Sequence, residues 1–347
     1  MDNKQDVYRK GISVIVCCYN SALRLPETLK HLFAQVVNSN INWEILIINN
    51  ASTDNTATVA LAEYTASKSK IPFKIIAEKQ EGLIYARIAG LYQSAYAYMV
   101  WVDDDNWLQP DYINIAYQVM EDNPHIGILG GIGIPTLQGE APPWFETYKL
   151  AYATGKQAPQ PGEIHASGFL YGSGAVIRKA AWLFIIKKGF KSILTGRKGK
   201  ALLCGEDVEL GNAMRIAGFK LWYDERLIFK HFIPPERLTW QYILKSTKGS
   251  GESDISAAIF YFVSRYPELN FSRLKYLYYK RLVWLLLQIL KHPKSVFQFI
   301  FNRDNSKNWE IIETNRNIAN LICSFKNREL AFSVFHNISL FKQNVKY

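Results

Sequence analysis

The sequence lacks the long apolar run that a membrane-spanning helix requires. No stretch reaches roughly 18 uninterrupted apolar residues, and the longest candidate, Leu282 to Leu290, is about half the length needed. The N-terminus, MDNKQDVYRKG, also lacks the apolar core of a signal peptide. We therefore expect neither a membrane-spanning anchor nor export by the signal-peptide route.

Cysteine is scarce, and two common phosphate-binding turns are missing. The four cysteines, Cys17, Cys18, Cys204 and Cys323, form no C-x-x-C pair, and the adjacent pair lies in an apolar run, which indicates a reducing, cytoplasmic environment. No G-x-G-x-x-G follows the first predicted strand, and no G-x-x-x-x-G-K-S/T occurs. Neither a Rossmann turn nor a P-loop would hold phosphates here, so a metal ion would have to take that role.

The first third of the chain contains a regular alternation of strand and helix patterns. Short, apolar, β-branched runs predict buried strands over residues 12–18, 43–48, 73–76 and 98–102. Helical patterns lie between them over about 23–37, from about 54 to 67, and around Arg87. This alternation predicts an α/β fold with a mostly parallel sheet covered by helices on both faces. The 347 residues suffice for one large domain or two smaller ones.

The remainder of the chain is less regular. Helices are predicted over 111–123, over 179–187 and from Gly205-Glu206-Asp207 to Gly218, and strands over 171–177 and 219–233. The segment 130–168 has many Gly and Pro residues and is expected to be irregular. Because it also carries several aromatic residues, we interpret it as a lid or a wall of a substrate site.

Three consecutive carboxylates, Asp103 to Asp105, end the fourth predicted strand. Adjacent carboxylates repel one another, and a bound cation best explains why three of them occur together. Mg²⁺ and Mn²⁺ bind one or two carboxylates together with substrate phosphates. The alternative is that they cap the next helix. Ligands of parallel sheets bind at the carboxyl ends of the strands. Tyr19, Asn49, Asn50, Asp103 and Asp105 are all expected there.

Seven segments occur in the order typical of one enzyme family. They are VIVCCYN, IINNASTDNT, EGLIYAR, VWVDDDNWLQPDYI, GSGAVIRKAAW, GEDVELGNAMRIAG and KHFIPPERLT, and they cover roughly residues 12–240. With these segments the sequence resembles the family-two glycosyltransferases of the GT-A fold, of the type that builds bacterial cell-surface polysaccharides. The resemblance implies transfer of a sugar from a nucleotide-diphosphate sugar, with inversion of the anomeric centre, to a glycan or lipid-linked oligosaccharide acceptor.

The resemblance also implies roles for the metal-binding and catalytic residues. Asp103 and Asp105 match the D-x-D motif, with Asp105 the expected direct metal ligand and Asp103 nearer the sugar or ribose. His231 matches a histidine that completes the metal shell or contacts the diphosphate, although a structural role would explain it equally well. The ion would be Mn²⁺ or Mg²⁺. Asp207 aligns with the catalytic base, and Glu206 orients the acceptor or caps its helix.

The donor site follows from the same resemblance. Tyr19 would stack beside the base, and Asn49 or Asn50 would bind its edge, although the family often has Asp at one or both of these positions. An amide both donates and accepts, so uracil, guanine and thymine all fit, and the donor would be a UDP- or GDP-linked sugar. The other residues assigned to this site are Asn20, Asp54, Arg87, Asp103 and Asp104, of which Asp104 also fits a structural role. A helix cap would explain Asp54 equally well, and a salt bridge would explain Arg87.

The C-terminal part of the chain is basic and amphipathic. Residues 271–347 hold 13 Lys and Arg against 4 Asp and Glu, a net charge of +9 within a total of +11. From Phe271 onward, basic residues interleave with Tyr, Trp, Phe and Leu, as in an interfacial helix on anionic lipid. The alternative is that these helices pack on the catalytic domain with their basic faces in water. Nucleic acid is not an expected partner, because no nucleic-acid-binding motif accompanies the charge.

These patterns predict a catalytic domain over 1–264, with a nucleotide-binding half over about 10–125 and an acceptor half over 126–264, followed by a helical tail over 265–347. We expect a cytoplasmic enzyme attached peripherally to the inner face of the plasma membrane. Two other classes stay open. A nucleotidyltransferase normally has a Gly/Arg/Lys-rich loop after its first strand, which VIVCCYN lacks. A non-catalytic glycan- or nucleotide-binding module is disfavoured by the joint presence of Asp105, Asp207 and His231.

Overall fold

The computed structural model describes residues 8–165, 168–197, 202, 204–266, 268–301 and 309–346. Within it the chain forms two compact units. The first unit comprises Met1–Thr136, Ala153–Lys187 and Ala213–Phe232, and the second comprises Leu137–Tyr152, Lys188–Asn212 and Ile233–Tyr347.

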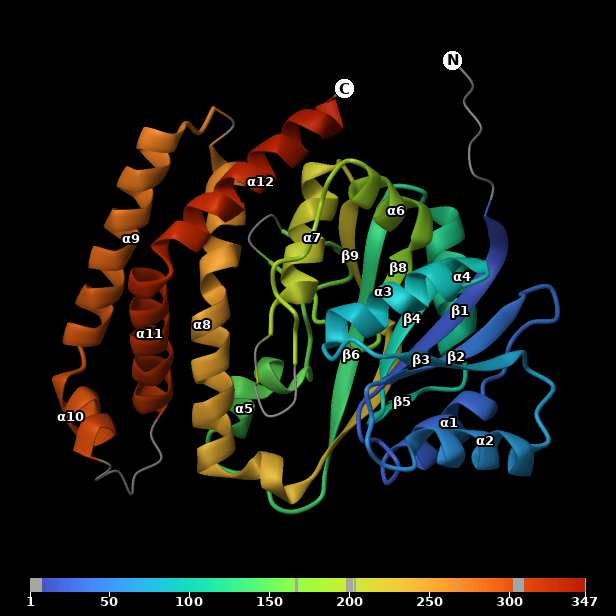
Figure 1. The fold of residues 1–347 in the computed structure, drawn as a ribbon. Coiled ribbons are helices and arrows are strands. Elements are labelled where there is room, and N and C mark those ends of the chain that lie inside the picture. The colour runs from blue at the N-terminus through green and yellow to red at the C-terminus, as the bar shows by residue number, and fades with distance from the viewer. Residues whose placement is uncertain are drawn as a thin grey trace. The chain divides into compact units, whose positions relative to one another are not determined.

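Four parallel strands form the centre of the first unit (Figure 1). They lie in the order β3 (Phe73–Glu78), β2 (Trp43–Asn50), β1 (Arg9–Cys18) and β4 (Tyr96–Asp103). The helices α1 (Leu25–Phe33), α2 (Thr56–Ser67) and α3 (Leu83–Gln93) lie between them in the chain. The pairing is parallel because the helical crossovers return the chain to the same end of the sheet. The strands and helices predicted for the first third of the chain are confirmed.

Helices cover both faces of this sheet. On one face, alternate residues of β1, β2 and β4 share a core with α1, α2 and α4 (Tyr112–Asp122). On the other face, the ring of Trp101 lies beneath the guanidinium of Arg87 from α3, 4.0 Å from the ring centroid. Trp182 of α6 (Lys179–Lys187) contacts the same ring edge-on, with centroids 5.3 Å apart. The predicted α/β fold with both faces covered is confirmed.

Further strands extend the sheet beyond β4. The order continues through β8 (Val176–Arg178), β6 (Ile126–Leu137), β9 (Lys220–Ile233) and β5 (Asn106–Leu108), and β7 (Gly162–Glu163) pairs with β9. β8 runs antiparallel to β4, and β5 runs antiparallel to β9. No local sequence pattern predicts β5, because it has only three residues. Its pairing with β9 places Asn106 opposite His231.

The prediction of irregular structure over 130–168 is wrong for its first part, because β6 continues to Leu137. Glycines give this strand the composition of a loop, but close packing requires them. A Cβ added at Gly131 would lie 2.0 Å from the backbone oxygen of Leu227, and one at Gly133 would lie 2.2 Å from that of Ala153. The strand predicted over 171–177 is also shorter than expected, since only β8 forms there.

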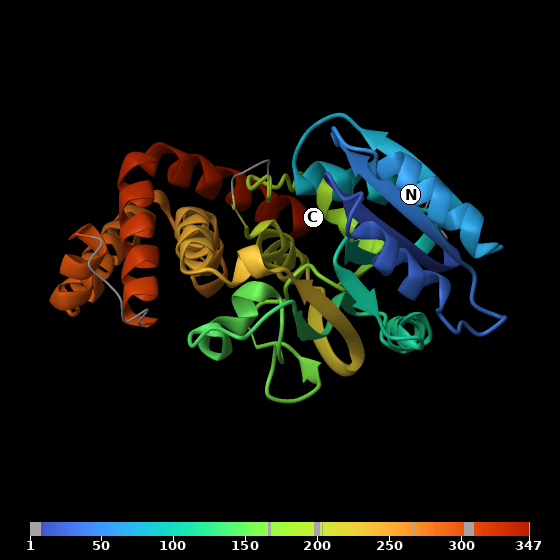
Figure 2. The ribbon, with the colours of Figure 1, turned by 90° about the horizontal axis from the view of Figure 1, so that it is seen from below.

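The second unit is mainly helical. After η2 (Pro235–Leu238) it contains α8 (Trp240–Arg265), α9 (Phe271–Leu290), α10 (Pro293–Phe301), α11 (Trp309–Lys326) and α12 (Arg328–Lys346). Figures 1 and 2 both show α11 between α8 and α9. The predicted C-terminal helices are therefore confirmed, and they belong to the same compact unit as α8. Within the part of the chain that the structure describes, no helix combines the length and apolar content needed to cross a bilayer.

Aromatic and aliphatic side chains hold the segment 137–152 against these helices. This segment carries α5 (Phe145–Tyr148) and η1 (Lys149–Tyr152). Trp144 and Phe145 share a core cluster with Ile243 of α8 and Ile312 of α11. The aromatic residues that predicted a substrate wall here are thus largely used for packing inside the second unit.

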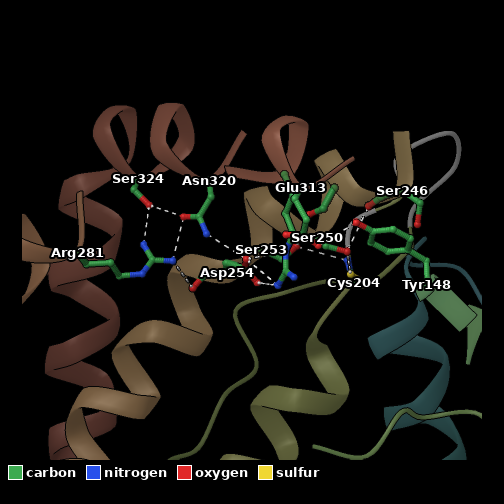
Figure 3. Close-up of polar contacts among 12 residues, drawn as sticks. Tyr148, Cys204, Ser246, Ser250, Ser253, Asp254, Arg281, Glu313, Asn320 and Ser324 are labelled. Carbon is green, nitrogen blue, oxygen red and sulfur yellow. Dashed lines mark hydrogen bonds and ion pairs between the residues drawn. The ribbon is translucent and has the colours of Figure 1, made fainter. Parts of the chain in front are cut away.

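A polar network fixes α8, α9 and α11 relative to one another (Figure 3). The carboxylate of Asp254 on α8 accepts hydrogen bonds from Arg316 and Asn320 of α11, at 3.1 and 3.0 Å. Arg281 of α9 donates to the side-chain oxygen of Asn320 at 2.9 Å and to the hydroxyl of Ser324 at 3.2 Å. Connected polar groups of this kind specify one packing arrangement.

Candidate functional site

The carboxyl ends of three parallel strands meet at one edge of the first unit. In the strand register Cys18 lies opposite Asn49, and Cys17 lies opposite Asp103. Tyr19, which follows β1 directly, therefore lies beside Asn49 at the strand ends, and Asp103 ends the neighbouring strand. The prediction that these strand ends share one edge is confirmed, and that edge is where an open α/β sheet binds its ligand.

Asn20 and Asp54 tie together the turns that follow β1 and β2. Asn20 has a φ of 50°, and its side-chain oxygen accepts a hydrogen bond from the backbone N–H of Thr53 at 2.8 Å. Asp54 accepts from the backbone N–H groups of Ala22, at 3.0 Å, and of Thr56, at 3.1 Å. Burial alone would raise the pKa of Asp54, but the hydrogen bonds from Thr56 and Ala22 outweigh it and lower this pKa. The bond to the N–H of Thr56, the first residue of α2, ties Asp54 to the start of this helix, although the residue at the N-cap position is Asn55.

The two asparagines that end β2 have different surroundings. The amide of Asn50 is buried and donates to the backbone oxygen of Gln80 at 2.7 Å, while its oxygen accepts from the N–H of Gly82 at 3.0 Å. Asn50 therefore holds the turn that leads into α3. The side-chain oxygen of Asn49 is buried and has no hydrogen-bond partner among the described residues. Of the two, Asn49 is the one whose side-chain oxygen has no hydrogen-bond partner in the described part of the chain.

Arg87 and Asp103 lie near the segment that follows residue 171. The stacked guanidinium of Arg87 leaves no room for a side chain at Gly172, where an added Cβ would lie 2.2 Å from an Arg87 nitrogen. The neighbouring Ser173 donates its hydroxyl to the carboxylate of Asp103 at 2.5 Å. Ser173 was not among the predicted site residues, although its place in YGSGAVI, between two glycines, gave a signal.

Asp104 binds residues at the start of α1. Its carboxylate forms a 2.6 Å ion pair with Arg24, and its backbone oxygen accepts from the hydroxyl of Thr28 at 2.8 Å. Burial and the nearby charge of Asp105 raise the pKa of Asp104, against the opposing effect of Arg24. The helix-cap alternative for the trio is wrong, because β5 follows it and α4 begins only after Asp111.

Asp105 and His231 form a buried pair. A carboxylate oxygen of Asp105 lies 3.3 Å from the Nε2 atom of His231, and the two residues are 3% and 5% exposed. The backbone N–H of Phe232 donates to the backbone oxygen of Asp105 at 2.9 Å. The β5–β9 pairing thus brings together two residues that are far apart in the sequence. The Nδ1 atom of His231 is buried and has no hydrogen-bond partner in the described part of the chain.

The side chains of these two residues carry donor atoms of types that divalent metal ions bind. Among the described residues there is no group of three or more His, Cys, Asp and Glu side chains that would hold a metal by itself. A carboxylate and an imidazole are nevertheless suitable donors for Mn²⁺, and such ions commonly complete their shell with substrate phosphates and water. Asp105 and His231 therefore offer two donors for an ion whose remaining ligands come from elsewhere.

Glu206 and Asp207 begin α7 (Glu206–Ile216) in the second unit. The carboxyl group of Glu206 is buried against Gly196, where an added Cβ would lie 2.8 Å from its Cδ atom. Gly196 has a φ of 69°, a conformation that favours glycine. Asp207 is half-buried, and one of its oxygens accepts from the N–H of Val208 at 2.8 Å. Both acids suit the positive end of the helix dipole.

Glu209, one turn further along α7, organises the segment that precedes the two acids. One oxygen of its buried carboxylate accepts from the Ser192 hydroxyl at 2.6 Å and from the N–H groups of Ile193 and Leu194 at 2.9 and 3.0 Å. The other oxygen accepts from the hydroxyl of Ser256 on α8. Glu209 was not among the predicted site residues, although three acids within GEDVEL are more than a helix cap requires.

Glu209→Ala is expected to lower the free energy of unfolding by about 3 kcal/mol, because it leaves buried donors without an acceptor. Urea denaturation measures this change. Glu236→Ala is the matched control, since that residue is exposed in the same unit and should change stability by less than about 0.5 kcal/mol. Equal midpoints for the two variants would contradict the anchoring role of Glu209.

Comparison with known proteins finds a family model that matches part of the chain. Residues 13–182 match the family model described as glycosyl transferase family 2. The chain is 30% identical over 102 residues to the putative glycosyltransferase EpsH of Bacillus subtilis, and 23% identical over 246 residues to the poly-beta-1,6-N-acetyl-D-glucosamine synthase of Staphylococcus aureus. These matches cover 29% and 70% of this chain but only 28% and 55% of the relatives, so the chain spans about half or less of the length of these curated relatives.

One similar solved structure is the mannosyltransferase PcManGT from Pyrobaculum calidifontis, in complex with GDP-Man and Mn²⁺. It has a TM-score of 0.52 and 12% sequence identity, and the match covers 98% of this chain and 86% of the other. At this identity the likeness concerns the fold, and it agrees with the predicted GT-A-type architecture.

Proposed function

Since residues 13–182 match the model of glycosyl transferase family 2, we propose that the chain transfers a sugar from a nucleotide-diphosphate sugar to a glycan or lipid-linked acceptor, with inversion of the anomeric centre. The buried pairing of Asp105 with His231 at the strand ends is the observation that carries the proposal. The family match gives no support to a nucleotidyltransferase or a non-catalytic module. The named relatives include a polysaccharide synthase, which supports a role in cell-surface polysaccharide synthesis.

The donor nucleotide is proposed to bind at the ends of β1, β2 and β4. Tyr19 would stack on the base, and the buried oxygen of Asn49 would accept a hydrogen bond from its edge, where uracil and guanine both carry an N–H donor. Asp103, held by Ser173, would contact the ribose or the sugar. The remaining residues assigned to this site act on it through the turns and helices that they hold; they are Asn20, Asn50, Asp54, Arg87 and Asp104.

Asp105 and His231 are proposed to hold Mn²⁺ or Mg²⁺, with Asp103 nearby. The ion would neutralise negative charge that develops on the leaving diphosphate. The solved complex of PcManGT with GDP-Man and Mn²⁺ supports the use of a divalent ion by a protein of similar fold. The burial of Asp105 and His231 would strengthen their interaction with such an ion, because water screens it little there.

Asp207 is proposed to be the catalytic base. As an acceptor hydroxyl attacks the anomeric carbon on the side opposite to the diphosphate, its proton passes to the Asp207 carboxylate. The bond from the anomeric carbon to the acceptor oxygen forms while the bond to the diphosphate oxygen breaks. Glu206, buried against Gly196, would orient the acceptor, and Glu209 would hold the segment around them.

For the domain organisation, we propose that residues 1–264 carry the donor and acceptor sites and that residues 265–347 form a tail. The proposed partners are a UDP- or GDP-linked sugar, the acceptor and an anionic membrane surface. The location that fits them is the cytoplasmic face of the membrane, to which the enzyme would bind peripherally.

A panel of nucleotide sugars with Mn²⁺ tests the function. We expect slow hydrolysis of one UDP- or GDP-linked sugar without added acceptor, because water can replace the acceptor hydroxyl. Thermal shift with UDP and with GDP should identify the same base. If no donor is hydrolysed and neither nucleotide raises the melting temperature, the proposal is wrong.

A further inference from the structure

Helix α9 has two apolar faces, and only one of them is covered. Its inner face consists of Leu274, Tyr278, Leu285 and Ile289, which are all buried. Six large apolar side chains lie on the opposite side and are 46–63% exposed: Tyr276, Tyr279, Val283, Leu286, Leu287 and Leu290. At 3.6 residues per turn these six side chains form one continuous stripe along the helix, which we name the α9 outer face. A helix that is apolar on both sides normally has a second environment to contact.

Polar contacts on the inner side keep the α9 outer face exposed. Arg281 reaches Asn320 and Ser324 of α11, as Figure 3 shows. The hydroxyl of Tyr278 donates to the backbone oxygen of Ser324 at 2.5 Å. Rolling α9 to bury its outer face would break these bonds and leave the Arg281 guanidinium without partners in an apolar setting. The exposure of the stripe is therefore a stable property of the helix.

The charges on α9 itself all have one sign. The helix carries Arg273, Lys275, Lys280 and Arg281 and has no acidic residue. The next acidic residue after Glu268 is Asp304, so α10 adds only positive charge through Lys294. By helical periodicity, Lys275 and Lys280 border the apolar stripe on opposite sides. Apolar and aromatic side chains bordered by lysines suit the boundary between headgroups and acyl chains.

We propose that the α9 outer face binds the surface of an anionic lipid bilayer, with the helix lying in the plane of the membrane. Negative headgroups would neutralise the bordering lysines while the stripe enters the acyl boundary. A second copy of the chain fits less well, because a two-fold contact would place the same basic residues against one another. The inference rests on the peripheral membrane attachment proposed above and deepens it by naming the surface that makes the contact. Lipid binding is measured without any donor or acceptor, so a failure to bind vesicles would leave the proposal of sugar transfer standing.

Flotation of the full chain with phosphatidylcholine vesicles, with and without phosphatidylglycerol, tests the proposal. We expect the chain to float only with the anionic vesicles, and more salt should weaken binding. The double variant Val283→Glu/Leu287→Glu should bind more than about tenfold more weakly, because it places two charges in the stripe. Leu61→Glu is the matched control: Leu61 is 56% exposed on α2, as Val283 is 58% exposed on α9, and this change should leave binding unaltered.

A charge variant keeps the test decisive if the double variant folds poorly. Lys280→Glu alters one exposed side chain at the border of the stripe and should weaken binding to anionic vesicles by at least about fivefold. Failure of the unaltered chain to float with anionic vesicles at low salt would overturn the proposal. Equal flotation of the unaltered chain and the Val283→Glu/Leu287→Glu variant would also overturn it. A third contrary result would be that no form of the chain floats, while light scattering shows a dimer of the unaltered chain that the double variant abolishes.

Discussion

Asp207→Asn is expected to reduce sugar transfer by about 10³-fold or more, while nucleotide binding stays within about twofold of the unaltered chain. Asparagine has nearly the same shape as aspartate, but its amide cannot take a proton from the attacking hydroxyl. Its side-chain oxygen can still accept the hydrogen bond from the N–H of Val208 at the start of α7. The variant therefore removes the proposed base and keeps the local helix contact. Product formation and isothermal titration with UDP or GDP measure the two effects.

Two comparisons decide how this result is understood. Glu236→Gln removes a charge from an exposed residue in the same unit and should leave both transfer and binding unchanged. If Asp207→Asn instead lost binding as much as transfer, Asp207 would be a structural residue of α7. Glu206→Gln should raise KM for the acceptor more than it lowers kcat, because Glu206 is proposed to orient the acceptor and not to accept its proton.

The fold of the first unit was largely predictable, because its signals are local. β1 to β4 are apolar, β-branched runs, and each is followed by turn residues and a helix pattern. β6 was not predictable in the same way. Gly131 and Gly133 are needed because Leu227 and Ala153 approach the strand closely, and a contact with residues far along the chain leaves no local signal. The same composition therefore suits a loop and a tightly packed strand.

The positions of the candidate site residues were partly predictable, but their contacts were not. The strand register follows from the parallel order, so the meeting of Asn49 and Asp103 at one edge could be expected. Asn50 binds backbone groups, whereas the oxygen of Asn49 has no partner in the described chain. This difference depends on how the turn between β3 and α3 folds back. The pairing of His231 with Asp105 depends on β5, which is too short to predict.

Asp105→Ala is expected to remove the effect of Mn²⁺ on nucleotide binding. In the unaltered chain, Mn²⁺ should tighten UDP or GDP binding by about 100-fold, and chelation with EDTA should reverse this. Without the Asp105 carboxylate, His231 and the diphosphate would be the main remaining ligands, so affinity with Mn²⁺ should fall close to the metal-free value. Titration calorimetry with and without Mn²⁺ measures the difference. Asp111→Ala, which changes an exposed acid just before α4, is the matched control and should respond to Mn²⁺ normally.

A second variant separates metal binding from a purely structural role of the buried pair. If both residues hold one ion, His231→Ala should weaken Mn²⁺-dependent binding, and the double variant with Asp105→Ala should be little worse than Asp105→Ala alone, because groups that act on one ligand are not additive. If Asp105 only positions His231 and β5, Asp105→Ala would lower the urea midpoint and leave the Mn²⁺ effect unchanged. The 3.3 Å contact between the two side chains is compatible with both roles, and the dependence of nucleotide affinity on Mn²⁺ distinguishes them.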